Sequence, residues 1–207
     1  MKKFFRKDVT VKEVKTCFKG FFKVNEYHIN HALYSGGRTE TFTREVFERG
    51  NAVVMLPYDP VLDRVVLQEQ FRPGALNFGE SPWILECVAG MFGENESPIE
   101  VAIREAEEEA GLIIEPEYVE KIIEYLSSPG GTSEVIYLYL GKVNSEGAEG
   151  VFGLPEENED ILVQTYSLAE AIDFVNSGKI TNAATIIALQ WLFMNRAAIQ
   201  EKWLVKE

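Results

Sequence analysis

Residues 90–112, GMFGENESPIEVAIREAEEEAGL, are the stretch that decides the fold of this chain. The glycines at its start predict a flexible turn. Ser97 and Pro98 predict the beginning of a helix, with a serine N-cap and a proline at the first helical position. Glu100, three residues after Ser97, completes the pattern of a capping box. Gly111 predicts the end of the helix, because glycine readily adopts the left-handed conformation found there.

The residues of this helix divide into two faces at about 100° per residue. Three glutamates gather on one of them, Glu105, Glu108 and Glu109, because residues three and four apart stack above one another. Adjacent like charges cost stability unless something offsets them, and a hard divalent cation with oxygen ligands would do so. A solvated acidic face is the general alternative for a glutamate-rich helix. The apolar side chains on the neighbouring face are expected to pack inward: Ile99, Ala102, Ile103, Ala106 and Ala110.

The spacing of the whole stretch is more specific than its composition. Gly90, Glu96, the pair Arg104-Glu105, the pair Glu108-Glu109 and Gly111 stand at the intervals of the Nudix hydrolase signature, without a departure at a defining position. So many fixed identities make a chance match very improbable. The chain therefore resembles the Nudix hydrolase family. This resemblance implies a mixed-sheet α/β/α sandwich, and it extends through nearly the whole chain to the bacterial ADP-ribose diphosphatase (ADP-ribose pyrophosphatase) branch.

Several stretches outside the signature carry the resemblance to this branch. A proline downstream of the box marks the ADP-ribose group, and Pro129 stands slightly further along than is usual for it. The matching stretches are 21–22, 44–50, 69–72, 88–112, 128–134, 158–161 and 178–191.

Composition and charge limit the classes of function. The chain has 207 residues, of which 46% are hydrophobic, enough for a substantial core. The formal charge of −13 argues against nucleic acid or an anionic membrane as a partner, since both need a basic surface. Cys17 and Cys87 have no zinc-site spacing and are interpreted as inert thiols. No signal peptide or membrane span is recognisable, so a cytoplasmic location is expected.

The chain is predicted to have two parts. Residues 1–50 form an N-terminal antiparallel β subdomain with strands over 9–15, 21–33 and 39–47. Three short strands are weak on their own and should pack on the main domain or on a second copy of the chain. Residues 51–207 form the Nudix hydrolase domain, with a turn predicted at 57–60 and a loop at 147–160. Its further strands are expected over 51–56, 64–72, 83–89, 118–126, 135–143 and 161–166, and its helices over 167–177 and 181–203.

The acidic helix face suits the chemistry of diphosphate hydrolysis. Such a reaction needs neutralised phosphate oxygens and an activated in-line water, and divalent metals supply both. Glu105 and Glu109, one turn apart, can bind one ion together, and Glu108 can reach the next. The resemblance adds the backbone carbonyl of Ala89 as a further metal ligand. Arg104 is expected to orient the glutamates as part of the catalytic set. Mg²⁺ is the expected cofactor, with Mn²⁺ as the alternative.

A general base is expected from the acidic loop at 155–161. By composition this loop is a solvated surface segment. It also resembles the loop that closes over the site in bacterial ADP-ribose diphosphatases, where one glutamate deprotonates the water and the glutamate two residues later binds metal. Glu157 is therefore assigned as the base and Glu159 as a metal ligand. The sequence leaves open whether these two roles are exchanged.

The resemblance also implies a nucleotide site and a homodimer. In this branch the N-terminal strands are exchanged between subunits and help to form the adenine pocket. Arginine suits such a site because its planar fork bonds phosphate oxygens in pairs. From composition alone, the two phenylalanines could equally be core residues, and Arg49 could pair with Glu48 or Glu45. The implied substrate-binding residues are Phe21, Phe22, Arg44, Glu45, Arg49, Arg72, Met91, Ser128 and Glu134.

Together these features predict a Mg²⁺-dependent hydrolase that splits ADP-ribose into AMP and ribose 5-phosphate. In the expected mechanism a water attacks one phosphorus and Glu157 takes its proton. One alternative is a hydrolase of another nucleoside diphosphate sugar, such as GDP-mannose. A second alternative is a Nudix domain that senses a ligand in a transcription regulator. The intact box, the absence of a helix-turn-helix pattern after it and the negative charge oppose that second alternative.

Overall fold

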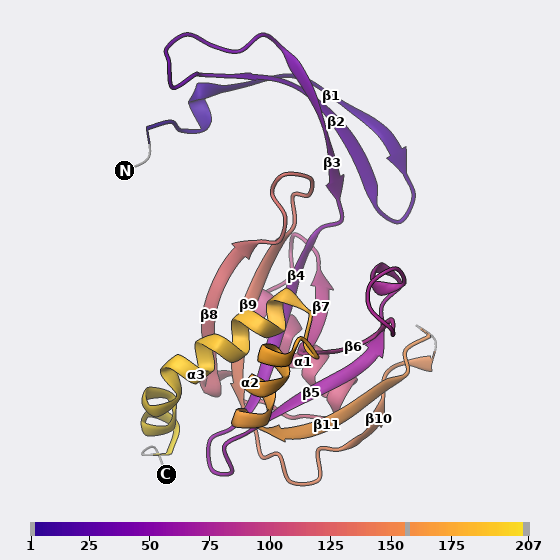
Figure 1. Cartoon of the computed structure of the whole chain (residues 1–207), viewed down its shortest axis with the longest axis vertical. Coiled ribbons are helices and arrows are strands. Elements are labelled where there is room, and N and C mark those ends of the chain that lie inside the picture. Colours follow the sequence, from indigo (N-terminus) through magenta and orange to yellow (C-terminus); the bar gives the residue numbers. More distant parts are fainter. Residues whose placement is uncertain (1–2, 156–157, 205–207) are drawn as a thin grey trace. The chain divides into compact units, whose positions relative to one another are not determined.

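The computed structural model describes residues 3–155 and 158–204 and divides into two compact units (Figure 1). Unit 1 comprises Met1–Gly50 and Leu126–Val135, and unit 2 comprises Asn51–Tyr125 and Ile136–Glu207. The loop between two strands of the main sheet therefore belongs to unit 1. No helix in the described ranges is long and apolar enough to cross a bilayer.

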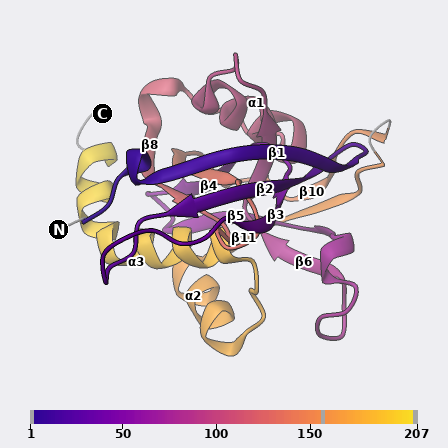
Figure 2. The same cartoon turned by 90° about the horizontal axis from the view of Figure 1, so that it is seen from above.

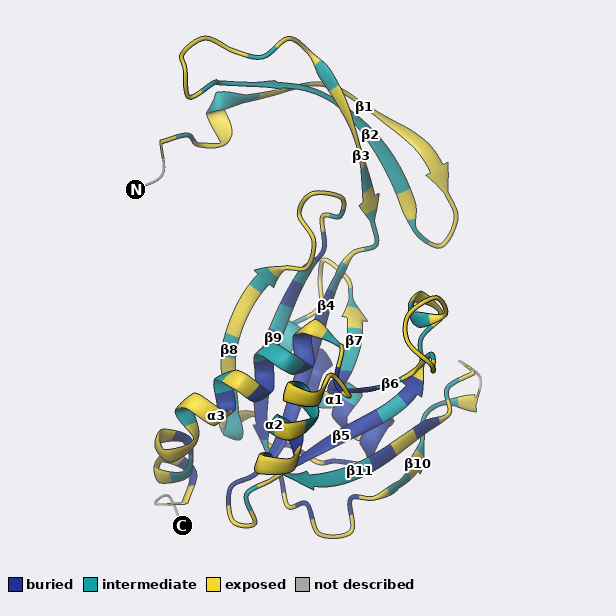
Figure 3. Ribbon diagram, in the orientation of Figure 1, coloured by how far each residue is buried: buried dark blue, intermediate teal, exposed yellow. Residues whose placement is uncertain are grey.

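Unit 1 contains a three-stranded antiparallel sheet in the order β1-β2-β3. The three predicted strands are present as β1 (Val9–Lys19), β2 (Lys23–His31) and β3 (Phe42–Glu48), after a short 3-10 helix at Arg6–Asp8. Phe21 and Phe22 lie in the turn between β1 and β2, not in a strand as expected. No residue of the described range 3–50 is buried, so this sheet has no closed core of its own (Figure 3).

Unit 2 is built on an eight-stranded mixed sheet with the order β10-β11-β5-β4-β9-β8, in which β6 pairs with β5 and β7 with β4. The β4–β9 pair is parallel, whereas β5 pairs antiparallel with β4, β6 and β11. The strands are β4 (Asn51–Asp59), β5 (Arg64–Phe71), β6 (Trp83–Glu86), β7 (Val88–Phe92), β8 (Val119–Leu126), β9 (Val135–Lys142), β10 (Gly150–Phe152) and β11 (Ile161–Ser167).

Helices cover both faces of this sheet, as the predicted α/β/α sandwich requires. Figure 2 shows α1 (Pro98–Ala110) on one side and α2 (Leu168–Ser177) and α3 (Ala183–Leu204) on the other. Side chains alternate between the faces of a strand. In β4, Val53 and Met55 accordingly join the core beneath α1, whereas Val54 and Leu56 join the core beneath α2 and α3. The predicted fold class is confirmed.

Local sequence signals explain two of the helix boundaries. Ser167 and Glu170 form the predicted capping box of α2, with each residue's side chain accepting from the other's backbone N–H. Gly111 ends α1 with φ of 63°, as predicted. At the start of α1 the predicted capping box is absent, because the Ser97 side chain makes no cap hydrogen bond. Pro98 at the first helical position removes one of the unpaired backbone N–H groups of the first turn.

Three details of the strands differ from the prediction. β4 continues to Asp59, through most of the expected turn at 57–60. Pro57 is tolerated there because it lies between Met55, the last residue paired with β7, and Tyr58, the first paired with β5. The predicted strand 83–89 is interrupted at Cys87 and forms β6 and β7. The predicted loop 147–160 contains the short strand β10, which pairs with β11.

Candidate active site

Helix α1 presents its three glutamates at very different depths. Ala102, Ala106 and Ala110 are buried against the sheet, and this fixes the rotation of the helix. On the neighbouring side Glu109 is only 3% exposed. The side chain of Glu105 is half-buried at 16%, whereas that of Glu108 is 40% exposed. The acidic face is therefore not a uniformly solvated one.

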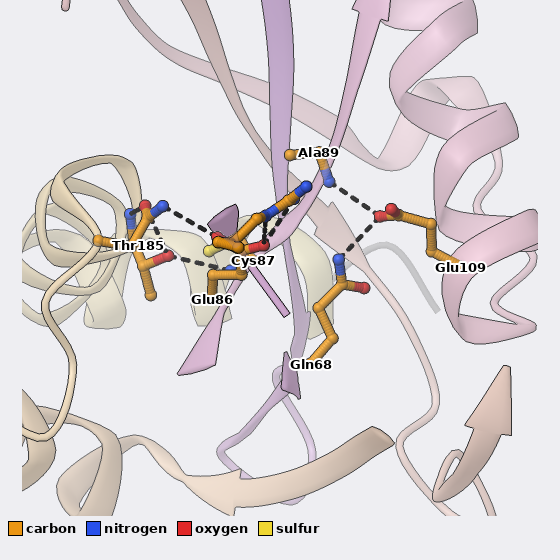
Figure 4. Close-up of polar contacts among 8 residues, drawn as sticks. Gln68, Glu86, Cys87, Ala89, Glu109 and Thr185 are labelled. Atoms are coloured by element: carbon orange, nitrogen blue, oxygen red, sulfur yellow. Dashed lines mark hydrogen bonds and ion pairs between the residues drawn. The ribbon is translucent and has the colours of Figure 1, made fainter. Parts of the chain in front are cut away.

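Among the described residues, the hydrogen-bond donors to Glu109 are neutral (Figure 4). Its Oε2 accepts from the side-chain amide of Gln68 in β5 at 2.8 Å and from the backbone N–H of Ala89 in β7 at 3.0 Å. Burial raises the pKa of Glu109 to about 7, and the charges of Glu105 and Glu159 contribute to the increase. A buried carboxylate without a cationic partner is costly in its ionised form. A bound cation would stabilise the ionised form of Glu109.

Glu105 lies directly against the backbone of β7. A Cβ atom built at Gly90 would stand 2.3 Å from the carboxylate carbon of Glu105. Only glycine leaves that space for the carboxylate, which explains the glycine at the start of the box. Burial raises the pKa of Glu105, and hydrogen bonding to Arg104 opposes the increase.

Arg104 connects three acids of the box. One Nη donates to Glu105 at 3.0 Å, the other lies 3.4 Å from Glu96, and Nε lies 3.8 Å from Glu108. Glu96 also accepts from the backbone N–H of Gly93 at 2.7 Å, so it ties the loop before α1 to Arg104. These contacts give Arg104 the geometry of a residue that orients the glutamates.

The described residues include only part of the acidic loop. Glu157, the predicted base, lies outside the described residues. Glu159 accepts from the backbone N–H of Leu154 at 3.3 Å. Its charge is near enough to Glu105 and Glu109 to raise the pKa of both. The loop therefore brings one of its carboxylates toward the acidic face of α1.

The donors present fit a hard divalent cation in chemistry, although they are not arranged as a finished metal cage. Among the described residues, no three acidic, histidine or cysteine side chains form a group that could hold a metal ion as they stand. Glu105 and Glu109 are instead turned toward protein donors. Ala89 donates its N–H to Glu109, and the N–H and C=O of a strand residue point to the same side. Its carbonyl oxygen thus faces the edge where the glutamates lie.

Arg72, the residue after β5, is held by a buried carboxylate in the same unit. Its Nε and one Nη lie 2.7 and 2.6 Å from Oε1 of Glu86 in β6. Arg72 also lines a cavity of about 370 Å³, together with Gly74, Ala75, Phe78, Ile84 and Thr181. Met91, another predicted substrate residue of unit 2, lies in β7 opposite Ala52 with its side chain exposed.

Unit 1 brings together some of the predicted nucleotide-binding residues. The ring of Phe22 packs edge-on against Phe47 with centroids 5.2 Å apart, and the guanidinium of Arg49 lies 5.5 Å from the Phe22 centroid. Arg49 also pairs with Glu134 at 3.1 Å, and not with Glu48 or Glu45 as composition allowed. Phe22, Arg49 and Glu134 therefore form one cluster, in which the Nε of Arg49 is buried without a hydrogen-bond partner among the described residues.

The other predicted residues of unit 1 are exposed and take no part in the ion pair between Arg49 and Glu134. Phe21 is 88% exposed and touches Phe22 edge-on. Arg44 donates to the carbonyl of Thr43 and lies over the ring of Phe42, and Glu45 is its exposed neighbour in β3. The carbonyl of Ser128 accepts from Gly131 and Thr132 and closes the turn of its loop.

Three polar residues that support the site were not predicted from the sequence: Gln68, Glu86 and Asn182. For Gln68 a signal was present, because a polar run follows Val65-Val66-Leu67 in an otherwise buried strand. Glu86 likewise was the one polar side chain in the apolar stretch 83–89. Asn182 caps α3 and contacts Glu86, which lies far from it in the chain. No local pattern in the sequence predicts that contact.

The chain is similar to several known proteins in sequence and in fold. A family model described as NUDIX domain matches residues 48–187. An ADP-ribose pyrophosphatase of Escherichia coli (strain K12) is 46% identical over 200 residues, covering 97% of this chain and 95% of that protein. A GDP-mannose pyrophosphatase of Yersinia enterocolitica is 32% identical over 174 residues, covering 84% and 88%. A crystal structure of an ADP compounds hydrolase superposes with a TM-score of 0.69, covering 92% and 95% at 21% identity, a likeness of fold alone.

Proposed function

Because the chain belongs to the Nudix family, we propose that it is a divalent-metal-dependent hydrolase that splits ADP-ribose into AMP and ribose 5-phosphate. The observation that carries the proposal is the buried Glu109 beside Glu105 in an intact box. The high identity to ADP-ribose pyrophosphatases over nearly the full chain supports the choice of substrate.

The metal ligands in this proposal are the Ala89 carbonyl, Glu105 and Glu109 for one ion, and Glu108 and Glu159 for a further one. Mg²⁺ is the proposed ion, with Mn²⁺ as a substitute, because carboxylate and carbonyl oxygens suit hard cations. When bound, such ions neutralise diphosphate oxygens and lower the pKa of water. The burial of Glu109 and the proximity of Glu159 support these assignments.

The remaining residues of unit 2 orient the reactants and move the proton. Arg104 keeps Glu105 and Glu108 in place through its ion pairs with them. Glu157 takes the proton of the attacking water; this role is inferred from the resemblance of its loop. Arg72 binds a substrate phosphate through the part of its guanidinium that Glu86 leaves open. Backbone atoms near Met91 contribute to the same binding.

We assign the adenine nucleotide to the aromatic and charged residues of unit 1. Phe22 offers a ring for stacking on the base, and Arg49 lies over that ring. Phe21, Arg44, Glu45, Ser128 and Glu134 are the other proposed contacts. Phe22→Ala should raise KM several-fold with kcat little changed, because uniform binding would be lost. Unchanged kinetics would remove Phe22 from the site.

We propose a homodimer in which the N-terminal strands are exchanged. A sheet with no buried residue over 3–50, and with Phe18 and Phe21 exposed, needs a covering partner. Light scattering of the full chain should give twice the mass of one chain, and a monomer at micromolar concentration would contradict the proposal. The cytoplasmic location and the lack of nucleic-acid or membrane partners remain predictions from the sequence.

A panel of nucleoside diphosphate sugars tests the substrate assignment. With Mg²⁺ present, we expect ADP-ribose to give equal amounts of AMP and ribose 5-phosphate, with the highest kcat/KM of the panel. GDP-mannose is the second candidate, because the GDP-mannose pyrophosphatase also aligns over most of the chain. A higher kcat/KM for GDP-mannose would overturn the choice of ADP-ribose. Tight binding without turnover of any substrate would indicate a sensor instead of an enzyme.

A further inference from the structure

Glu86 is a buried carboxylate whose two oxygens bind residues of different elements. Oε1 accepts from Nε of Arg72 and forms an ion pair with one Nη at 2.6 Å, and Oε2 accepts from the side-chain amide of Asn182 at 3.0 Å. The exposed fraction of Glu86 is 3%. In Figure 4, Glu86 lies at the end of β6 on the side of the site that faces Thr185. The carboxylate thus links the end of β5 to the beginning of α3.

The side-chain amide of Asn182 uses its oxygen to cap α3 and its nitrogen to bind Glu86. Its Oδ1 accepts from the backbone N–H of Thr185 at 3.1 Å and caps the start of α3. Its Nδ2 donates to Glu86. Thr185 is itself fully buried, and its hydroxyl accepts from the N–H of Cys87, where β6 ends and β7 begins. The N-terminus of α3 is therefore a fixed point for Glu86.

The arrangement leaves one part of Arg72 open. The side chain is 39% exposed, and its second terminal nitrogen has no hydrogen-bond partner among the described residues. Arg72 and Thr181, the residue before Asn182, line the same cavity of about 370 Å³. A long side chain that is already ordered loses less entropy when it binds an anion.

We propose that Glu86 and Asn182 are positioning residues, which hold the guanidinium of Arg72 toward this cavity to receive an anionic group of the substrate. The inference rests on the proposed function, since it takes the substrate to be a diphosphate. Asn182 acts through Glu86, and Glu86 acts through Arg72. Neither residue touches the substrate.

Two variants of Asn182 separate positioning from helix capping. Asn182→Ser and Asn182→Asp both keep an N-cap oxygen, and both lose the amide donor. Asn182→Asp also places a second carboxylate against Glu86. We expect KM for ADP-ribose to rise about tenfold in Asn182→Ser, because a hydrogen bond to a charged group is lost. We expect a larger rise in Asn182→Asp, with kcat changed less than about twofold in both. Asn195→Ser, on the same helix, is the matched control and should leave KM unchanged.

A double-mutant cycle with Arg72→Ala distinguishes this role from a general structural one. If Asn182 acts through Arg72, Asn182→Ser should add nothing to the KM of Arg72→Ala. An equal further rise in that background would overturn the inference. So would an Asn182→Asp variant with the KM of the unaltered protein, the result expected if Asn182 only caps α3. Should Asn182→Ser fail to fold, the Asn182→Asp comparison still decides.

The positioning role of Asn182 and Glu86 can fail while the proposed function holds, and the experiments distinguish the two results. If another nucleoside diphosphate sugar proves to be the substrate, the same cycle is measured with that compound, and the inference stands or falls on it. If ADP-ribose is hydrolysed and the two substitutions act additively, the inference is wrong while the proposed function holds.

Discussion

The amide of Gln68 donates to the carboxylate of Glu109 at 2.8 Å, and both side chains are buried between β5 and α1 (Figure 4). The two residues are far apart in the sequence, and the sheet brings them together. A neutral donor fixes the carboxylate without neutralising it. The remaining amide oxygen of Gln68 is buried without a hydrogen-bond partner among the described residues. We therefore infer that Gln68 serves to orient Glu109, and not to complete a hydrogen-bond network that only stabilises the fold.

Gln68→Leu should weaken metal binding. The substitution keeps the approximate volume but removes the donor that orients Glu109, and loss of such a supporting contact typically costs about tenfold or more in metal affinity. Titration calorimetry with Mn²⁺ measures the change. Gln164→Leu in β11 is the control, since Gln164 contacts Tyr166 and not the glutamates. An unchanged affinity in Gln68→Leu would show that Glu109 does not depend on Gln68.

The metal-free protein should lose stability as pH rises from about 4.5 to about 7. The pKa of Glu109 is raised by burial to about 7, above its usual 4.5, so over this range the folded state binds more protons than the unfolded state. The full effect at pH 8 is about 3 kcal/mol. Urea unfolding in EDTA at pH 5 and pH 8 measures it. Glu109→Gln removes this titration. The variant should therefore have the higher free energy of unfolding at pH 8, and its advantage over the unaltered protein should be smaller at pH 5. If the free energies of unfolding of the two proteins changed in parallel with pH, the raised pKa of Glu109 would be contradicted.

Gly90→Ala should displace Glu105. The added methyl group would lie 2.3 Å from the carboxylate, but the end of this side chain can rotate away. We therefore expect the free energy of unfolding to fall by less than about 1 kcal/mol. The Mn²⁺ affinity should fall about tenfold, because a ligand is turned aside. Gly74→Ala, where nothing lies within 4 Å of the new atom, is the control for both measurements. A normal affinity in Gly90→Ala would mean that Glu105 is not a ligand.

The sequence predicted the elements that depend on local chemistry. The helical period placed three glutamates on one face, and Gly111 and Ser167 marked the boundaries of α1 and α2. The helical pattern could not predict how deeply each of these glutamates is buried. Glu108 and Glu109 are neighbours in the same motif, yet only Glu109 is buried, because Gln68 and Ala89 come from strands that pack against that turn.

Contacts between distant segments account for most of what the sequence did not predict. Pro57 suggested a turn, whereas its place between two strand pairings keeps it within β4. Asn182 looked like an ordinary polar residue before a helix, and only the fold brings its amide to Glu86. For Glu157 the prediction from the resemblance stands untested, since that residue lies outside the described ranges.

The most direct test is the rate of AMP formation from ADP-ribose with and without Mg²⁺, for the unaltered protein, Glu109→Gln and Glu107→Gln. Glu107 is exposed on the same helix and serves as the control. We predict Mg²⁺-dependent turnover that Glu107→Gln retains. Glu109→Gln should lose at least about a hundredfold in kcat/KM, or about 3 kcal/mol of transition-state stabilisation. Turnover that is independent of divalent metal, or that Glu109→Gln retains, would contradict the account.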